Sequence, residues 1–170
     1  MTAAGILACD LAKRPGFAYA APGVVPVTHG GADLINGPIG DDHGRLYGAL
    51  RDRLNDLVTV HGPREMWIEA PLPMTGRSLD TEEALFGLAA TAKLVANDRG
   101  VRCETAHVGT VRSHVLGNGR ADKAMAIKWS FSHGWRPTGD DEADALVLLC
   151  YAASCQDPPW RLTRGERRAA

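Results

Sequence analysis

Apolar residues in the first thirty positions fall into three short runs that proline and glycine separate. The runs cover 5–11, 16–21 and 24–28, and their length and apolar content predict three β-strands. Short connections join strands that run in opposite directions, so we expect an antiparallel meander. The first of these strands carries an acidic residue, Asp10, near its end.

At Gly44 the spacing of apolar residues changes to that of a helix. Apolar residues then recur every three or four positions until a His-Gly-Pro stop at 61–63, which predicts an amphipathic helix with one buried face. The residues of this apolar face are Leu46, Leu50, Leu54, Leu57 and Val58.

The rest of the chain alternates between strand and helix patterns. A buried strand is expected at 65–69, and a helix from about Asp80 to Asp98, because Asp80 and Glu83 have the spacing of a capping box. A fifth strand is expected at 101–105. Three more helices are expected near 108–115, 122–131 and 141–153. This order predicts an α/β fold with a five-stranded mixed sheet flanked by helices.

Length and composition indicate one domain. A chain of 170 residues with 45% hydrophobic content buries one substantial core, which we assign to 1–157. The basic end, 158–170, is expected to be a mobile tail. No run has the length of a membrane span, and the four cysteines form no CxxC pair, so we expect a cytoplasmic protein with reduced thiols.

The net charge of −1 argues at first against nucleic-acid binding, because phosphate contacts normally require a basic excess. The average conceals a difference between the two parts of the chain. Residues 1–98 carry 8 Lys and Arg against 12 Asp and Glu, whereas residues 99–170 carry 11 against 8. The second part is therefore the better candidate for contacts with phosphates.

Acidic residues stand at positions that a fold of this kind can bring together. Asp10 ends the first strand and Glu69 ends the fourth, so both carboxylates project from one sheet edge if these strands are neighbours. Asp141 and Asp144, three residues apart, share one face at the start of the last helix. A single acid at a strand end is usually a turn or cap residue, and only the set of four points to chemistry.

Four carboxylates in one place repel one another, and without a cation one or more of them takes up a proton at neutral pH. Hard oxygen ligands favour Mg²⁺, with Mn²⁺ as a substitute. Two such ions about 4 Å apart activate a water molecule and stabilise the leaving oxygen in phosphodiester hydrolysis. Their charge would also offset the negative net charge at a site that meets DNA.

The start of the last helix leaves one assignment open, because three acids follow one another there. Asp140 is the near alternative to Asp141 as a metal ligand, and either of them also fits the N-cap of the helix. Glu142 is expected to face solvent.

Four segments together resemble a known family. They are Asp10 after its apolar strand, IEAPL at 68–72, VLGNGRADKAM at 115–125 and DEADAL at 141–146. In order and spacing they resemble the RuvC family of Holliday-junction resolvases, including its shorter phage-type members, over about 5–153. The resemblance implies a ribonuclease H-like fold and a magnesium-dependent endonuclease that cuts four-way junctions in DNA recombination and repair. A junction with two-fold symmetry implies a homodimer, for which the helix at 80–98 is a candidate interface.

The resemblance also implies roles for single residues. It makes Asp10, Glu69, Asp141 and Asp144 metal-binding catalytic carboxylates, and Lys123 a basic residue at the scissile phosphate. The residues it places at the DNA are Arg112, Arg120, Lys123, Leu72 and Met74.

Two of these positions depart from the family pattern. Arg112 stands where a lysine is common, so we expect phosphate binding but not proton transfer. Leu72 stands where an aromatic residue is common, and Leu72 or Met74 either wedges between bases or simply packs.

Three other functions match parts of the pattern. Sugar kinases and actin-like ATPases also begin with a strand-end Asp, but they need a glycine-rich phosphate-binding turn that this sequence lacks. A non-catalytic junction-binding protein is expected to have lost at least one of the four acids. A nuclease for other branched DNA, such as forks and flaps, would use the same carboxylates and remains the main alternative.

Overall fold

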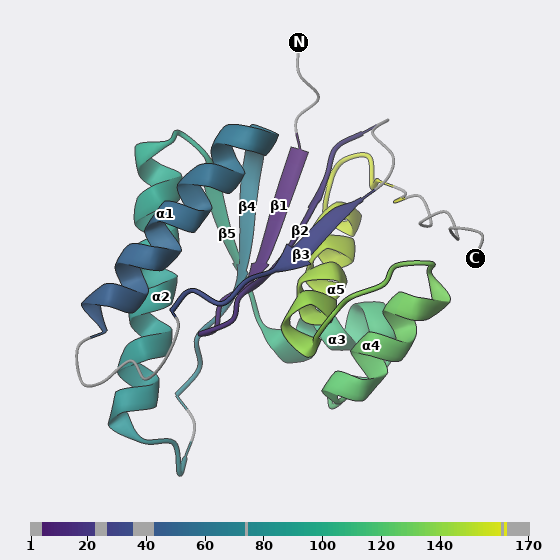
Figure 1. Cartoon of the computed structure of the whole chain (residues 1–170). Coiled ribbons are helices and arrows are strands. Elements are labelled where there is room, and N and C mark those ends of the chain that lie inside the picture. The colour runs from purple at the N-terminus through teal and green to yellow at the C-terminus, as the bar shows by residue number, and fades with distance from the viewer. Residues whose placement is uncertain (1–4, 23–26, 36–42, 74, 161, 163–170) are drawn as a thin grey trace.

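A five-stranded mixed sheet forms the centre of the protein (Figure 1). The computed structural model describes residues 5–22, 27–35, 43–73, 75–160 and 162. The strand order is β3-β2-β1-β4-β5, with β1 antiparallel to β2 and parallel to β4. The strands are β1 (Gly5–Asp10), β2 (Gly16–Ala20), β3 (Thr28–Gly31), β4 (Pro63–Glu69) and β5 (Arg102–Ala106).

Four of the five predicted strands are confirmed, with boundaries that differ by one or two residues. The third was predicted at 24–28, whereas β3 begins at Thr28 and continues to Gly31, so the described part of the prediction overlaps β3 at Thr28 alone. The predicted positions 24–26 lie outside the described residues. β3 is an edge strand whose side chains are exposed or half-buried, so an apolar run does not mark it in the sequence.

Helices cover both faces of the sheet (Figure 1). Two lie on one face, α1 (Gly44–His61) and α2 (Leu79–Asp98). Three lie on the other, α3 (Val108–Leu116), α4 (Lys123–Ser132) and α5 (Asp140–Ser154). A hydrophobic core lies on each face of the sheet, and alternate residues of β1 point into the two cores. Leu7 and Cys9 pack with α1 and α2, whereas Ile6 and Ala8 pack with α5.

The first predicted helix is confirmed with its buried face, since all five residues of the predicted apolar stripe are buried in α1. Gly62 ends α1 in the left-handed region, with φ of 56°, and its N–H donates to Val58 O.

The start of α2 differs from the prediction. Ser78, not Asp80, is the N-cap, and its hydroxyl accepts a hydrogen bond from the Thr81 N–H. The predicted capping box is therefore wrong. Asp80 and Glu83 instead flank the buried side chain of His43. Asp80 Oδ1 lies 3.1 Å from His43 Nε2, and Glu83 Oε1 lies 3.8 Å from His43 Nδ1.

α5 is the most buried helix and lies against β1 and β2. Gly16 makes this close approach possible, because a Cβ at that position would lie 2.1 Å from the backbone oxygen of Asp141. The first turn of α5 is thereby placed beside the end of β1, where Asp10 is located.

Part of the predicted tail contacts the domain. The Trp160 N–H donates to Ala153 O at 2.9 Å, and Trp160 and Leu162 pack against the core around α5. Residues 161 and 163–170 lie outside the described residues. Among the helices described, none combines the length and apolar character that a membrane crossing requires.

Candidate active site

Four carboxylates that the sequence singles out line one cavity of about 310 Å³. Asp10 ends β1 and Glu69 ends β4, and these strands are parallel neighbours, so both side chains stand at the same sheet edge. Asp141 and Asp144 reach the cavity from the first turns of α5. The sequence predicted that Asp10 and Glu69 lie at one sheet edge if their strands are neighbours, and β1 and β4 are neighbours in the sheet.

The pKa values of these acids show that negative charge in the cavity is poorly balanced. Burial and the neighbouring carboxylates of Glu69, Asp144 and Asp141 raise the pKa of Asp10 well above its ordinary value. Burial and Asp144 raise the pKa of Glu69 to about 7, although Arg112 and Lys123 oppose this rise. Both pKa values are shifted in the direction expected when several carboxylates share one partly buried site.

Arg112, on α3, is the main counter-charge to Asp144. Its Nη2 lies 3.0 Å from both carboxylate oxygens of Asp144, and its Nη1 donates to Ala121 O at 2.7 Å. Both partners of this ion pair are largely buried, with side-chain exposures of 17% and 5%. Burial raises the pKa of Asp144, and Arg112 opposes that rise by charge and hydrogen bonding.

Lys123, the first residue of α4, contacts both acids at the start of α5. Its Nζ lies 2.6 Å from Asp140 Oδ2 and 3.4 Å from Asp141 Oδ1. The hydrogen bond from Lys123 is the main cause that lowers the pKa of Asp140. Asp141 lines the cavity with Asp10, Glu69 and Asp144, whereas Asp140 does not.

Glu142 does not face solvent, so that prediction is wrong. Its side chain is buried and accepts hydrogen bonds from the Thr138 N–H at 2.8 Å and the Thr138 hydroxyl at 2.7 Å. It also pairs with His29 Nδ1 on β3. This contact spans 113 residues of sequence and ties the start of α5 to the sheet edge.

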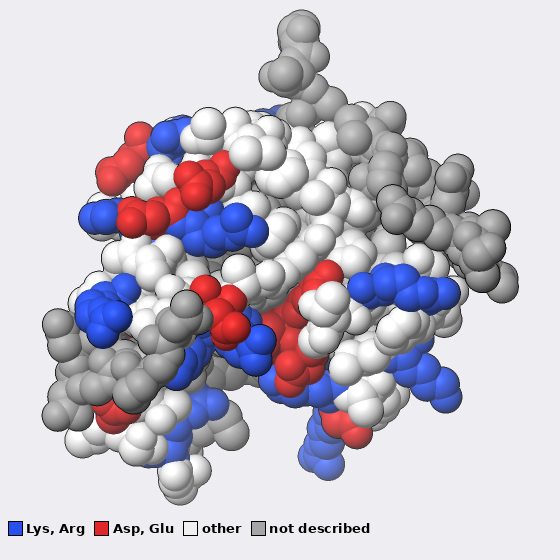
Figure 2. Space-filling model, viewed as in Figure 1, with Lys and Arg blue, Asp and Glu red and all other residues white. Residues whose placement is uncertain are grey.

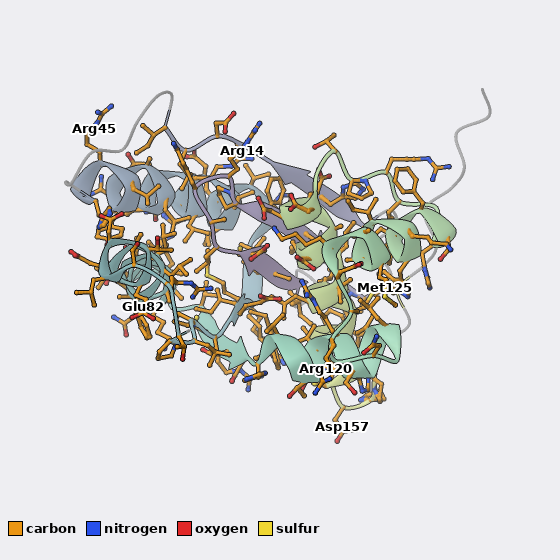
Figure 3. All side chains as sticks on the ribbon, turned by 90° about the horizontal axis from the view of Figure 1, so that it is seen from below. Arg14, Arg45, Glu82, Arg120, Met125 and Asp157 are labelled. Carbon is orange, nitrogen blue, oxygen red and sulfur yellow. The ribbon has the colours of Figure 1, made fainter. Side chains whose placement is uncertain are left out.

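The residues that the resemblance assigns to DNA contact lie in different places. Leu72 lines the cavity, Arg120 is exposed in the segment between α3 and α4, and Met74 lies outside the described residues. Figure 3 shows Arg120 on the α3 side of the sheet, opposite α1 and α2.

Arg77 and Leu85 are among the cavity-lining residues that the sequence analysis did not assign to the site. Arg77 reaches it from the segment before α2 and donates to Leu72 O at 3.0 Å, and Leu85 reaches it from α2 itself. The only signal in the sequence was a lone arginine after the proline-rich turn at 71–73, and neither its charge nor its position distinguishes it from a surface residue.

Basic and acidic side chains are interspersed on the face shown in Figure 2, where no continuous basic surface is visible. Within the described residues, no three His, Cys, Asp or Glu side chains are arranged to hold one metal ion between them. Arg112 forms an ion pair with Asp144, and Lys123 forms one with Asp140.

Comparison with known proteins identifies relatives of this chain, although no protein-family model matches it. The crossover junction endodeoxyribonuclease RuvC of Salinibacter ruber is 30% identical over 124 residues, which are 71% of this chain and 68% of that protein.

Solved structures show the same fold. Thermus thermophilus RuvC superposes with a TM-score of 0.65 at 16% identity, over 88% of this chain and 95% of that one. RuvC from T. thermophilus in complex with a Holliday junction substrate gives 0.69 at 16% identity, over 86% and 90%. A yeast mitochondrial Holliday junction resolvase gives 0.60 at 12% identity, over 85% and 75%. The fold is thus ribonuclease H-like, as the sequence predicted, and the chain belongs to the RuvC family of crossover junction endodeoxyribonucleases.

Proposed function

We propose that this protein is a structure-selective endonuclease that resolves Holliday junctions by paired phosphodiester hydrolysis. The observation that carries the proposal is the convergence of Asp10, Glu69, Asp141 and Asp144, from β1, β4 and α5, on one cavity. Family membership supplies the substrate class, because the S. ruber relative is a crossover junction endodeoxyribonuclease.

Divalent cations fit the chemistry of this donor set, since all four ligands are hard carboxylate oxygens. The raised pKa values of Asp10 and Glu69 mark an excess of negative charge that such ions would relieve. When bound, two Mg²⁺ ions, with Mn²⁺ as a substitute, supply an activated water and stabilise the leaving oxygen. Asp10, Glu69, Asp141 and Asp144 are the proposed ligands, with Asp141 rather than Asp140 because Asp141 lines the cavity.

Basic residues beside the acids are proposed to hold the DNA strand. Lys123 stands at the rim of the cavity with its Nζ near Asp140 and Asp141, so a phosphate placed over the acids lies within its reach. Arg120, exposed in the same segment, is proposed to contact a neighbouring phosphate. Leu72, in the cavity wall, and Met74 are proposed to contact bases at the crossover.

A homodimer is proposed because two symmetric incisions need two active sites across the crossover. Leu79, Phe86 and Leu94 on α2 are exposed large apolar side chains, and their spacing places them on one side of that helix. This apolar side of α2 is the proposed interface.

The first experiment replaces Asp10 by Asn and measures Mg²⁺-dependent nicking of a four-way junction. We expect nicking to be lost while junction binding persists, because basic residues rather than Asp10 hold the phosphates. Asp52→Asn, an exposed carboxylate on α1, is the matched control and should cut normally. Normal nicking by Asp10→Asn would contradict the metal assignment.

A second experiment offers four-way, three-way, flap and duplex DNA side by side. Paired nicks at symmetric positions in the four-way junction alone are the expected result. Equal cutting of all branched substrates would instead favour a nuclease of forks and flaps.

The dimer is tested by measuring molar mass in solution for Phe86→Glu. We expect this charge to shift the protein from dimer to monomer, because it would be buried in the interface. Phe131→Glu, at a similarly exposed apolar position on α4, is the control and should leave the mass unchanged. A monomeric native protein would contradict the proposal.

A further inference from the structure

Arg112 occupies the carboxylate that a metal ion at this site would need. We propose that Arg112 is a removable counter-cation: it neutralises Asp144 when no metal is bound, and metal binding requires its guanidinium to leave. This inference rests on the proposed function and concerns how that site is loaded. It makes Arg112 a residue that controls metal affinity, in addition to any contact with phosphate.

The geometry of the pair supports displacement. A single nitrogen, Nη2, lies 3.0 Å from both Oδ1 and Oδ2 of Asp144, so one terminal NH₂ group faces both oxygens that a metal would use. In a fork-shaped arginine–carboxylate pair, two nitrogens would share that task. Here Arg112 Nε is buried and, among the described residues, has no hydrogen-bond partner. The pair thus blocks Asp144 without the full set of bonds that the strongest arginine–carboxylate pairs make.

The arrangement of the acids agrees with this role. All four proposed ligands line the same cavity. Asp144 is the ligand whose two oxygens are both engaged by a cation within the protein. Lys123 also lines the cavity, but its Nζ lies closer to Asp140, at 2.6 Å, than to one oxygen of Asp141, at 3.4 Å. Among the described residues, Arg112 is therefore the cation that engages both oxygens of a proposed ligand.

Arg112 also connects metal loading to the segment that is proposed to hold DNA. Its Nη1 donates to the backbone oxygen of Ala121 at 2.7 Å, between Arg120 and Lys123. A guanidinium released from Asp144 would stay close to Ala121, and a DNA phosphate is an acceptor that suits its geometry and charge. Arg112 would thus form an ion pair with Asp144 before metal binds and with a DNA phosphate afterwards.

The test measures Mn²⁺ affinity by titration calorimetry without DNA, on the native protein, Arg112→Gln and Arg112→Lys. We expect Arg112→Gln to lower the Kd for Mn²⁺ by about tenfold, because the ion no longer displaces or faces a cation. Arg112→Lys should give an intermediate Kd, since a lysine keeps the charge but makes fewer contacts. Arg51→Gln removes an ion-paired arginine from α1 that does not line the cavity, and it should leave the Kd unchanged.

Thermal unfolding without metal supplies a second reading. Arg112→Gln should melt at a lower temperature than the native protein in EDTA, and Mn²⁺ should raise its melting temperature more. If Arg112→Gln does not fold, Arg112→Lys carries the test, and its Kd must still fall below the native value.

A Kd for Arg112→Gln equal to or higher than the native value, in a protein that cuts junctions, would overturn the counter-cation role and leave the proposed function intact. Absence of saturable Mn²⁺ binding in every form, together with absence of cleavage by the native protein, would overturn the metal site itself. The counter-cation role would then fail with it. Cleavage by the native protein distinguishes the two outcomes: it persists if only the counter-cation role fails, and it is absent if the metal site fails.

Discussion

The two glutamates of β4 differ in what the fold does with a carboxylate. Glu65 and Glu69 stand four residues apart on the same strand, so both project from the same face of the sheet. The pKa of Glu65 is lowered, whereas burial and Asp144 raise that of Glu69 to about 7. One strand thus holds one acid that the fold stabilises as an anion and one that it destabilises.

Hydrogen-bond donors account for the difference. Glu65 is only 1% exposed, and although burial alone would raise its pKa, the donors around it reverse the effect. They are Trp67 Nε1, Arg102 Nη2, Gln156 Nε2 and Arg64 Nη2, at 2.6 to 3.2 Å. For Glu69, burial and the carboxylate of Asp144 outweigh the opposing charges of Arg112 and Lys123. At Glu65 the surrounding donors stabilise the carboxylate anion and therefore the fold. At Glu69 the negative charge is not fully compensated within the protein, which is typical of a binding site.

The largest expected effect is on cleavage by Glu69→Gln. We expect the rate of junction nicking to fall by on the order of 10³-fold or more, because a proposed metal ligand is lost. The melting temperature in EDTA should not fall, because the substitution removes a repelled carboxylate. Nicking assays with unfolding curves on the same preparation check both. Retained nicking would show that the contrast between the two glutamates has no functional meaning.

Gly16→Ala tests how the sheet positions the start of α5. The new Cβ would lie 2.1 Å from Asp141 O, so we expect a loss of about 2–3 kcal/mol in unfolding free energy together with slower nicking. Gly48→Ala is the control, because a Cβ in that part of α1 meets nothing within 4 Å. It should stabilise the protein by about 0.5–1 kcal/mol. Equal stability changes in the two variants would contradict the close approach.

Glu65→Gln should give the converse of Glu69→Gln. We expect a loss of about 1–3 kcal/mol in unfolding free energy, because the amide leaves donors without their anion, while the nicking rate at low temperature stays near native. Urea unfolding checks the stability. The control Glu104→Gln removes the other partner of Arg102, a carboxylate side chain that is 40% exposed, and should cost well under 1 kcal/mol. A variant of Glu65 that lost nicking but not stability would reverse our assignment of the two glutamates.

The smallest effects should appear in the pH dependence of stability, measured in EDTA. Glu65 has a lowered folded pKa, so its contribution is present above the unfolded value of about 4.3 and is lost as pH falls. The penalty of Glu65→Gln should therefore shrink in acid. Glu69 has a raised folded pKa, so its ionisation destabilises the fold increasingly as pH rises from the unfolded value of about 4.3 to about 7, and the penalty is constant above that. Glu69→Gln should thus match the native protein near pH 4 and exceed it near pH 8, and the opposite order would contradict the pKa contrast.

Local patterns were sufficient for the elements that bury a continuous apolar face. The helical spacing of Leu46, Leu50 and Leu54 predicts α1 correctly, because a helix presents every third or fourth residue to one side. The same reasoning failed for β3, whose edge position leaves it with few buried side chains. It also misplaced the cap of α2, because Ser78 and Asp80 are both good caps and only the backbone conformation distinguishes them.

The amino-acid sequence by itself predicted the five helices and four of the five strands, because periodicity along the chain marks elements with a buried face. Its resemblance to the RuvC family singled out the four acids Asp10, Glu69, Asp141 and Asp144 as candidate ligands. Contacts between distant segments were decided only by the tertiary structure. Packing placed Asp141 in the cavity and Asp140 beside it, and buried Glu142 against a histidine 113 residues away. It also set Arg112 on Asp144. No local pattern encodes these pairings, because each depends on which side chains of separate elements meet once the sheet and helices have packed.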